Sequence, residues 1–470
     1  MQTEKTAASD FCVQRLRCQA ICPFMRRILK KMIKITKFGG SSVANAEQFR
    51  KVKSIIDADP SRRFVVVSAA GKATKSDNKI TDLLYLCHAH VEYHVDCSNV
   101  FSIIKKRFLD IRDELSLSVD IARELRSIES RITELSVDEL VSRGEYITAR
   151  LMADYLQFPF VDAADVIKLN YDGSIDFKAT DQNLKFIMRD HDRFVLPGFY
   201  GTTPDGAVKV MSRGGSDITG SILAKCLKAD LYENWTDVSG FMMADPHIIK
   251  DPKPIERTTY AELRELSYMG ASVLHEDAVF PVKEANIPIN ILNTNDPSAK
   301  GTIILDSIPA DSDDSTITGV TGKKGFAAIS VSKKHMSDQI GFVRRLLSIF
   351  EKYEINIEHL PSGIDSVSII VLEKDVRNKI YDIIAEIKSM LHPDEVRYVS
   401  DMALIATVGR NMSSRPGTSG RLFTALGAQN INVKVIIQPL DEINILVGVA
   451  SEDFERAIRA IYYTFVKENA

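Results

Sequence analysis

Two glycine-rich segments follow apolar runs and carry residues suited to binding anions. They are Lys37-Phe38-Gly39-Gly40-Ser41-Ser42, which begins at the end of the run 33–38, and Ser212-Arg213-Gly214-Gly215-Ser216-Asp217, which follows 208–211. Glycines let the backbone approach a phosphate, and free amides at a helix start point toward an anion. Each segment alone is also typical of a tight turn or of a helix N-cap at Ser216 or Asp217. Together, with opposite charges at Lys37 and Asp217, they predict a site where a phosphoryl group moves between two bound anions.

Three further residues could recognise a small charged substrate. Arg213 can bind a carboxylate through two parallel hydrogen bonds. Glu145, in Ser142-Arg143-Gly144-Glu145, suits either a ligand ammonium group or a solvated position at a helix start, and we expect Gly144 to interrupt the helical pattern there. Asp237 follows the apolar run 231–235, and α/β sheets hold ligands in the loops after their strands.

The elements that must position these residues alternate between strand and helix from Met32 onward. Strands are expected at 33–38, 64–67, 160–161, 194–196, 208–211, 231–235 and 287–292. Helices are expected after the first glycine segment, over most of 82–157, and at 217–227 and 260–269, with a polar loop at 72–79. This order predicts an α/β fold with an open, largely parallel sheet sandwiched by helices over residues 32–305.

An acidic segment with a proline, residues 306–316, is predicted to be a linker, and an internal repeat follows it. Gly341, Arg345 and Leu346 recur as Gly417, Arg421 and Leu422, 76 residues later. Each copy reads as strand, glycine-containing loop, amphipathic helix and strand. We therefore expect two ferredoxin-like βαββαβ units, at about 326–395 and 396–470, within a regulatory region 317–470.

Composition excludes several classes of protein. The net charge of the 470 residues is −3, which argues against a general nucleic-acid or membrane-surface binder, and no apolar run approaches the 18 residues of a membrane span. Six scattered cysteines favour free thiols in a reducing cytoplasm. Residues 1–31 are basic and lack the apolar core of a secretory signal, so we expect a disordered extension, with a transit peptide as the alternative.

These motifs occur in the order found in aspartokinases, and residues 32–470 resemble that family throughout. The segments are KFGGSS at 37–42, SRGE at 142–145, GFYG at 198–201, SRGGSD at 212–217 and TDVSGFMMADP at 236–246. The repeat resembles the paired ACT domains of these enzymes. The resemblance implies transfer of the γ-phosphoryl group of ATP, bound with Mg²⁺, to the β-carboxylate of L-aspartate. The product is 4-phospho-L-aspartate, the first intermediate on the way to lysine, threonine and methionine.

The resemblance also assigns roles to individual residues. Lys37 would bind the phosphates and stabilise the transition state, and Asp217 would orient Lys37 without acting as a base. The substrate would contact Thr81, Glu145, Arg213, Gly214, Gly215 and Ser216. ATP would contact Lys37, Phe38, Gly39, Gly40, Ser41, Thr236, Asp237, Met242, His247 and Ser272. Met242, His247 and Ser272 differ from the residues common in the family, and these differences bear on nucleotide affinity. The resemblance assigns no direct metal ligand.

Regulation by an amino acid is the last implication. The loop Met336 to Val343 resembles the effector loop of lysine-sensitive aspartokinases, so L-lysine is the expected effector and L-threonine the runner-up. The expected effector residues are Met336, Gln339, Gly341, Phe342, Val343, Glu358 and Asp365, the two acids being otherwise solvated loop residues. Such a site implies a homodimer or larger homo-oligomer through the ACT domains. Two alternatives stay open: a related kinase acting on another acidic amino acid such as glutamate, and a non-catalytic ACT sensor.

Overall fold

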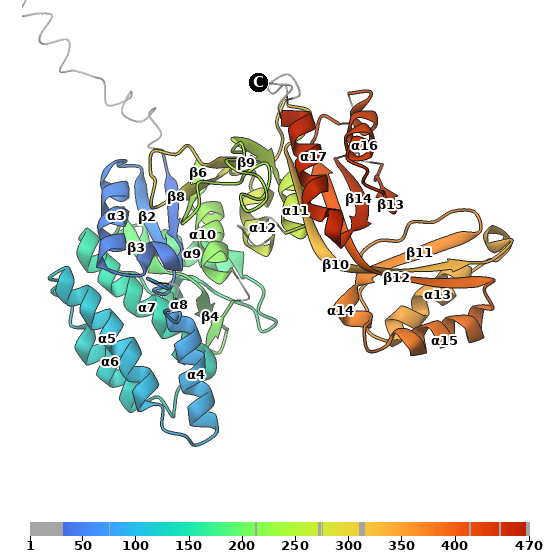
Figure 1. The fold of residues 1–470 in the computed structure, drawn as a ribbon. Helices are drawn as coiled ribbons and strands as arrows, with labels where there is room; N and C mark the ends of the chain where they lie inside the picture. The colour runs from blue at the N-terminus through green and yellow to red at the C-terminus, as the bar shows by residue number, and fades with distance from the viewer. Residues whose placement is uncertain are drawn as a thin grey trace, which may run out of the picture.

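The computed structural model describes residues 32–74, 76–211, 214–270, 274, 276–309, 315–412, 415–440 and 443–466. The predicted extension, residues 1–31, and the middle of the predicted linker lie outside these ranges. The described residues form an N-terminal region and a C-terminal region that meet around one helix, α11 (Tyr260–Tyr268) (Figure 1). No helix within the described ranges combines the length and apolar character that a membrane crossing requires.

The N-terminal region is built on a seven-stranded sheet, which confirms the predicted open, largely parallel sheet. In spatial order its strands are β3 (Phe194–Pro197), β2 (Arg62–Val67), β1 (Lys34–Phe38), β6 (Leu231–Thr236), β8 (Ile289–Asn293), β9 (Thr302–Leu305) and β7 (Arg257–Thr259). All neighbours pair in parallel except β8 and β9. The central strand β1 lies between β2 and β6, with Lys37 opposite Val66 and Asn234.

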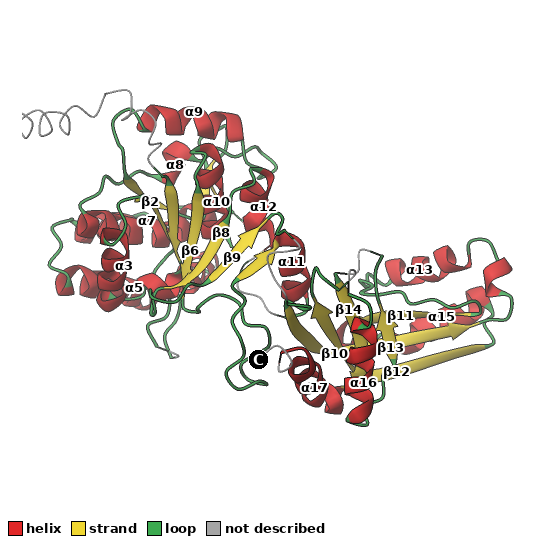
Figure 2. Ribbon diagram, turned by 90° about the horizontal axis from the view of Figure 1, so that it is seen from above, coloured by secondary structure: helices red, strands yellow, loops and turns green. Residues whose placement is uncertain are grey.

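Helices cover both faces of this sheet because its central strands are apolar on both sides (Figure 2). Val65 and Val67 of β2 pack in one cluster, and Phe64 and Val66 in another on the opposite face. The first face carries α3 (Ala46–Asp57), α4 (Ile80–Glu92), α5 (Ser98–Glu114), α6 (Ile121–Ser130) and α7 (Val137–Leu156). The second face carries α8 (Ala163–Val166), α9 (Phe177–Ile187), α10 (Gly215–Cys226), α11 and α12 (Glu276–Glu284).

Three local expectations differ from the structure. The expected strand at 160–161 is a single bridge between Phe160 and Val195. The expected strand at 208–211 is β5 (Val208–Val210), which pairs only with β4 (Tyr200–Thr202) in a separate hairpin. The helix expected after the first glycine segment is α3, but it begins later than expected because a 3₁₀ turn, η1 (Gly40–Val43), precedes it. Helix α3 begins after it because the Asn45 side chain caps the amide of Gln48.

The C-terminal region holds one antiparallel sheet. Its order is β11 (Ser366–Leu372), β10 (Gly319–Ser332), β12 (Glu395–Val408), β14 (Asn444–Ala450) and β13 (Val435–Ile437). The helices of this region are α13 (Phe342–Lys352), α14 (Glu373–Val376), α15 (Ile380–Leu391), α16 (Thr418–Ala428) and α17 (Phe454–Val466), with 3₁₀ turns η3 (Met336–Asp338) and η4 (Ser451–Asp453).

The two repeat units share the long strands β10 and β12. The second half of β10, from Phe326, pairs with β11 and with residues 395–402 of β12. The first half, 319–324, pairs with residues 403–408, which pair in turn with β14. The second unit therefore includes a strand that precedes the first unit in sequence, whereas the sequence indicated two consecutive units with the first starting near 326.

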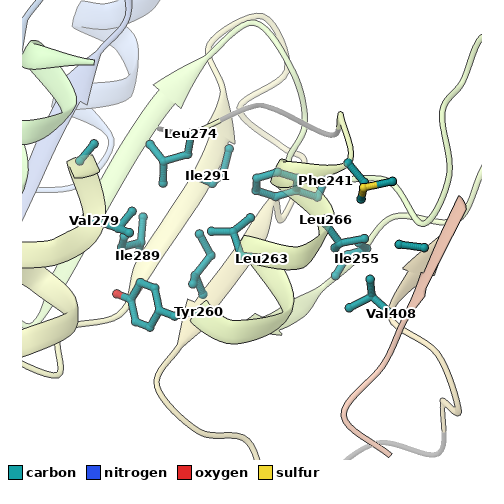
Figure 3. Close-up of a cluster of buried hydrophobic side chains, with 14 of the residues drawn as sticks. Phe241, Ile255, Tyr260, Leu263, Leu266, Leu274, Val279, Ile289, Ile291 and Val408 are labelled. Carbon is teal, nitrogen blue, oxygen red and sulfur yellow. The ribbon is translucent and has the colours of Figure 1, made fainter. Parts of the chain in front are cut away.

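The two regions share one hydrophobic cluster around α11. Phe241, Ile255, Leu263 and Leu266 of the N-terminal region lie beside Val408 of β12 (Figure 3). Hydrogen bonds cross the junction from the Val320 amide to the Met243 carbonyl, 2.7 Å, and from the Lys253 amide to the Tyr462 hydroxyl oxygen, 2.9 Å.

Polar side chains of α11 contact three parts of the C-terminal region. The carboxylate of Glu262 is fully buried and accepts hydrogen bonds from the Thr318 hydroxyl and from Arg410, whose Nη1 lies 3.0 Å away. The Asn444 amide donates to Glu265, and the Tyr268 hydroxyl donates to Glu358. Helix α11 is therefore the main polar connection between the regions.

Candidate active site

A cavity of about 810 Å³ opens beyond the carboxyl ends of β1 and β2, beside the start of α10. Its lining includes seven residues predicted from the sequence to bind substrate or act in catalysis. It also includes six others that the sequence analysis did not identify. The full lining is Lys37, Ser68, Lys79, Thr81, Asp82, Tyr85, Glu145, Phe199, Met211, Gly214, Gly215, Ser216 and Asp217.

Lys37 and Asp217 form an ion pair inside this cavity. The distance between Lys37 Nζ and Asp217 Oδ1 is 2.5 Å, and the two side chains are 8% and 17% exposed. The Asn234 amide donates to the same carboxylate oxygen over 2.8 Å. Because Lys37 and Asn234 are opposite each other on neighbouring strands, the sheet register fixes both partners of Asp217. The pairing agrees with the expectation that Asp217 orients Lys37.

The first glycine turn is held in place by backbone contacts from two sides. The Gly39 amide donates to the Trp235 carbonyl over 2.9 Å, and the Gly71 amide donates to the Gly40 carbonyl over 2.8 Å. A Cβ atom at Gly71 would lie 2.5 Å from the Gly40 carbonyl carbon. Glycine at this position therefore allows a second backbone segment to pack directly on the turn.

The second glycine segment starts α10 differently from the expectation. Gly214, with φ of +80°, is the N-cap, so Ser216 and Asp217 lie in the first helical turn and the prediction of an N-cap at either is wrong. A Cβ atom at Gly215 would lie 2.5 Å from the ring of Phe199. Ser212 and Arg213 lie outside the described residues, so the carboxylate-binding role of Arg213 stays a prediction.

Glu145 projects from the middle of α7, which runs without a break through Gly144. A Cβ atom at Gly144 would lie 3.0 Å from the Cβ of Ala69, so this glycine permits close packing and the expected interruption is wrong. Glu145 is 4% exposed, and its Oε2 has no hydrogen-bond partner. It is therefore not a solvated acid.

Burial controls the ionisation of Glu145. Desolvation raises the pKa of its carboxyl to about 8, against the opposing effect of backbone hydrogen bonds at Ala69 and at Glu145 itself. A buried carboxyl that lines a cavity with an unpartnered oxygen is suited to a ligand cation, because a bound ammonium group would supply both the missing hydrogen bond and the counter-charge.

Of the described residues expected to contact ATP, Lys37 alone lines this cavity. Thr236 ends β6, and its hydroxyl donates to Asp237 over 3.2 Å. Met242 forms a backbone bridge with Pro254, and the exposed His247 ring contacts Asp245 at 2.9 Å. Ser272 lies outside the described residues. The nucleotide contacts of these residues, and of Phe38, Gly39, Gly40 and Ser41, therefore stay predictions.

The six lining residues missed from the sequence come from two sources. Ser68 directly follows strand β2, and its place after a buried apolar run was a usable signal. Lys79, Asp82 and Tyr85 belong to the start of α4, and Phe199 and Met211 to the β4–β5 hairpin and its flanks. Their approach to Lys37 depends on tertiary packing that no local pattern records. No cluster of three or more metal-binding side chains occurs among the described residues.

Contacts within the chain hold the expected effector loop in place. Gly341 has φ of +76° and is the N-cap of α13, and Met336 is buried. The Met336 amide donates to Asp365 Oδ1 over 3.3 Å. Glu358 accepts from Tyr268 of α11. Both acids therefore have partners within the chain, and the effector role of the loop stays a prediction.

Comparison with known proteins identifies relatives over nearly the whole chain. Residues 32–293 match the amino acid kinase family, and residues 405–465 match the ACT domain. Aspartokinase 3 of Bacillus subtilis is 36% identical over 449 residues, covering 92% of this chain and 98% of that protein. The structure of Clostridium acetobutylicum aspartate kinase superposes with a TM-score of 0.86 at 46% identity, covering 93% of this chain and all of that one. Escherichia coli aspartokinase III, solved with aspartate and ADP, shares the fold at 23% identity, with a TM-score of 0.69 over 92% of this chain and 99% of that chain.

Proposed function

The chain belongs to the aspartokinases of the amino acid kinase family, and from this premise we propose how its residues carry out the reaction. The enzyme transfers the γ-phosphoryl group of ATP to the β-carboxylate of L-aspartate, giving 4-phospho-L-aspartate and ADP. The observation that supports the assignment most directly is the cavity that holds both the Lys37–Asp217 pair and the unpartnered Glu145.

The two halves of the chemistry fall to different residues. The β-carboxylate is ionised at neutral pH and attacks without a general base. The main barrier is the repulsion between two anions, which cations and backbone donors must offset. The Lys37 ammonium group, oriented by Asp217, stabilises the charge on the phosphates in the transition state. Glu145 binds the α-ammonium group of aspartate, and Arg213 binds its α-carboxylate.

Mg²⁺ belongs to the proposal as the cation that accompanies ATP. The carboxylate of Asp217 already contacts Lys37 and Asn234. We therefore assign the coordination of Mg²⁺ to phosphate oxygens and water, and bound Mg²⁺ would lower the charge that Lys37 faces.

A substrate panel tests the proposed function. Purified enzyme with ATP and Mg²⁺ should phosphorylate L-aspartate at least about tenfold more efficiently than L-glutamate, because an extra methylene changes the position of the reacting carboxylate. Arg213→Ala should raise the KM for aspartate far more than the KM for ATP. A preference for glutamate would mean that glutamate, and not aspartate, is the substrate. Equal effects of Arg213→Ala on the two KM values would mean that Arg213 binds the phosphates. No turnover of either acid would refute kinase activity.

We further propose L-lysine as a feedback inhibitor acting at the loop Met336 to Val343. Glu358 supports this choice because it is an acid beside the loop that also contacts α11, so a cationic effector would compete with Tyr268 for its carboxylate. A titration with lysine and with threonine tests the effector, and Glu358→Gln should weaken lysine inhibition while leaving uninhibited turnover unchanged. Inhibition of the wild type by threonine and not by lysine would refute lysine as the effector. Unchanged lysine inhibition of Glu358→Gln would refute the proposed effector site.

Assembly and location complete the proposal. Ile340 and Ile364 are 97% and 77% exposed near the effector loop, which favours burial against a second copy in a homodimer or larger assembly. Light scattering with Ile340→Asp should show a smaller mass than the wild type.

Cys87, Cys97 and Cys226 carry free thiols, which agrees with the proposed cytoplasmic location. Cell fractionation tests it.

A further inference from the structure

Arg107 lies outside the cavity, on α5, but binds the segment that forms one side of it. Its Nη1 donates to the carbonyl oxygens of Gly71 and Asn78, over 3.0 and 2.8 Å. Its Nη2 lies 3.7 Å from Asp77 Oδ2, and its side chain is 16% exposed. One guanidinium group therefore joins both ends of the segment 71–78.

Each end of this segment leads to a different part of the active site. Gly71 donates to the Gly40 carbonyl and packs on the first glycine turn, beside Lys37. Asn78 precedes Lys79 and is close in sequence to Thr81, both of which line the cavity at the start of α4. The separation of the two ends consequently sets the position of the glycine turn relative to the start of α4.

The described residues between the two ends of this segment are exposed or bonded mainly to one another. Lys72, Ala73 and Thr74 are exposed, and the side chain of Asp77 accepts hydrogen bonds from the amides of Ala73 and Thr74. These bonds shape the segment internally, whereas the Arg107 bonds attach it to α5. Nη1 bonds both carbonyl oxygens while Nη2 of the same plane faces Asp77, and a lysine ammonium group lacks this second nitrogen.

We infer that Arg107 is a positioning residue for phosphoryl transfer, which holds the glycine turn and the start of α4 at the separation that the reaction requires. Misplacement of reacting groups by about 1 Å can cost up to about 100-fold in rate. Because the Gly71–Gly40 bond remains without Arg107, we expect a smaller loss, about tenfold in kcat, for Arg107→Ala.

Chemical rescue distinguishes positioning from general stability. Added guanidinium ion at millimolar concentration should restore at least about a third of the lost kcat of Arg107→Ala, since it can rebind between the two carbonyls. Arg107→Lys should keep the thermal midpoint but not the rate. Lys105→Ala is the matched control, because Lys105 lies on the same helix and pairs with Glu129, 2.9 Å away, on α6. Lys105→Ala should lose about as much thermal stability as Arg107→Ala, but its kcat should not change and should not respond to added guanidinium ion.

The inference rests on the proposed function, and the two can fail separately. A wild type without aspartate-dependent turnover would refute the proposed function. An active wild type with Arg107→Ala and Arg107→Lys both within about twofold of Lys105→Ala in kcat and KM would refute the inference. Loss of rate without rescue, accompanied by a thermal midpoint well below that of Lys105→Ala, would assign Arg107 to the stability of the fold and equally overturn it.

Discussion

Glu145 makes the affinity for aspartate depend on pH in a way that can be worked out from its burial. With a pKa of about 8 in the absence of ligand, only about a tenth of this carboxyl is ionised at pH 7. An ammonium group binds the ionised form, so binding of aspartate at pH 7 releases close to one proton. The kcat/KM for aspartate should therefore rise almost tenfold between pH 6 and 7 and level off above pH 8.

The free energy of unfolding should also depend on the ionisation of Glu145, but it should fall with rising pH, whereas the affinity for aspartate rises. The folded pKa lies above the ordinary value of 4.5, so the folded protein holds this proton more tightly than the unfolded chain. The resulting stabilisation is complete below about pH 4.5 and is lost as the pH rises through 8. Two units below the pKa it amounts to about 3 kcal/mol, nearly all of which disappears by pH 8.5.

Glu145→Gln is the matched variant because it keeps the shape of the side chain and cannot ionise. The difference in unfolding free energy between wild type and variant should fall by about 2–3 kcal/mol from pH 6 to 8.5, measured by urea unfolding without ligand. The variant should bind aspartate weakly and with a flat pH profile. Calorimetry in buffers of different ionisation enthalpy should detect the released proton in the wild type alone. If the variant keeps the wild-type slope of kcat/KM, or if wild type releases no proton, the assignment of Glu145 to the substrate ammonium group is wrong.

Three other changes have defined expectations. Lys37→Ala should lower kcat by about two orders of magnitude or more, because the lost charge stabilises the transition state, while cooperative unfolding is retained; a kcat within about threefold of wild type would contradict this role. Glu262→Gln should lower the free energy of unfolding by about 3 kcal/mol because it removes the fully buried carboxylate charge that Thr318 and Arg410 contact, whereas the exposed ion pair of Lys300 with Glu256 should contribute less than about 1 kcal/mol when removed by Lys300→Ala; equal losses would contradict the reasoning. Deletion of residues 1–31 should leave turnover and thermal midpoint nearly unchanged, and a shift of several degrees would mean that the segment packs on the enzyme.

Much of the N-terminal region was predictable because local pattern and tertiary role coincide there. Strand β2 ends in the buried apolar run 64–67, and such a run is typical of the middle of a parallel sheet. Lys37 lies on β1 and Asp217 in the first turn of α10, each next to a glycine turn, so the motifs indicated both residues, whereas the separate β4–β5 hairpin that leads into α10 was not indicated. The family resemblance added the roles of these residues.

The positions that prediction missed depend on partners far away in sequence. Helix α7 continues through Gly144 because Ala69 occupies the space of a side chain, and no pattern within α7 records that neighbour. The first half of β10 contains Gly322, Lys323 and Lys324 and reads as a loop. It is a strand because residues 403–408 supply its hydrogen bonds, and Gly322 allows the close approach of the Leu404 carbonyl.

The shared strand β10 has a consequence for the order in which the chain can fold during synthesis. Gly319 pairs with Val408, and at about 5–20 residues per second a ribosome needs roughly 5–20 seconds to make the chain between them. During this interval residues 319–324 have left the ribosome without their β12 partner, and unpaired strand edges invite aggregation. The hydrogen bond from Val320 to Met243 joins this half-strand to a region that has already been synthesised. The N-terminal region thus offers this half-strand a binding partner before the rest of the C-terminal sheet has been made.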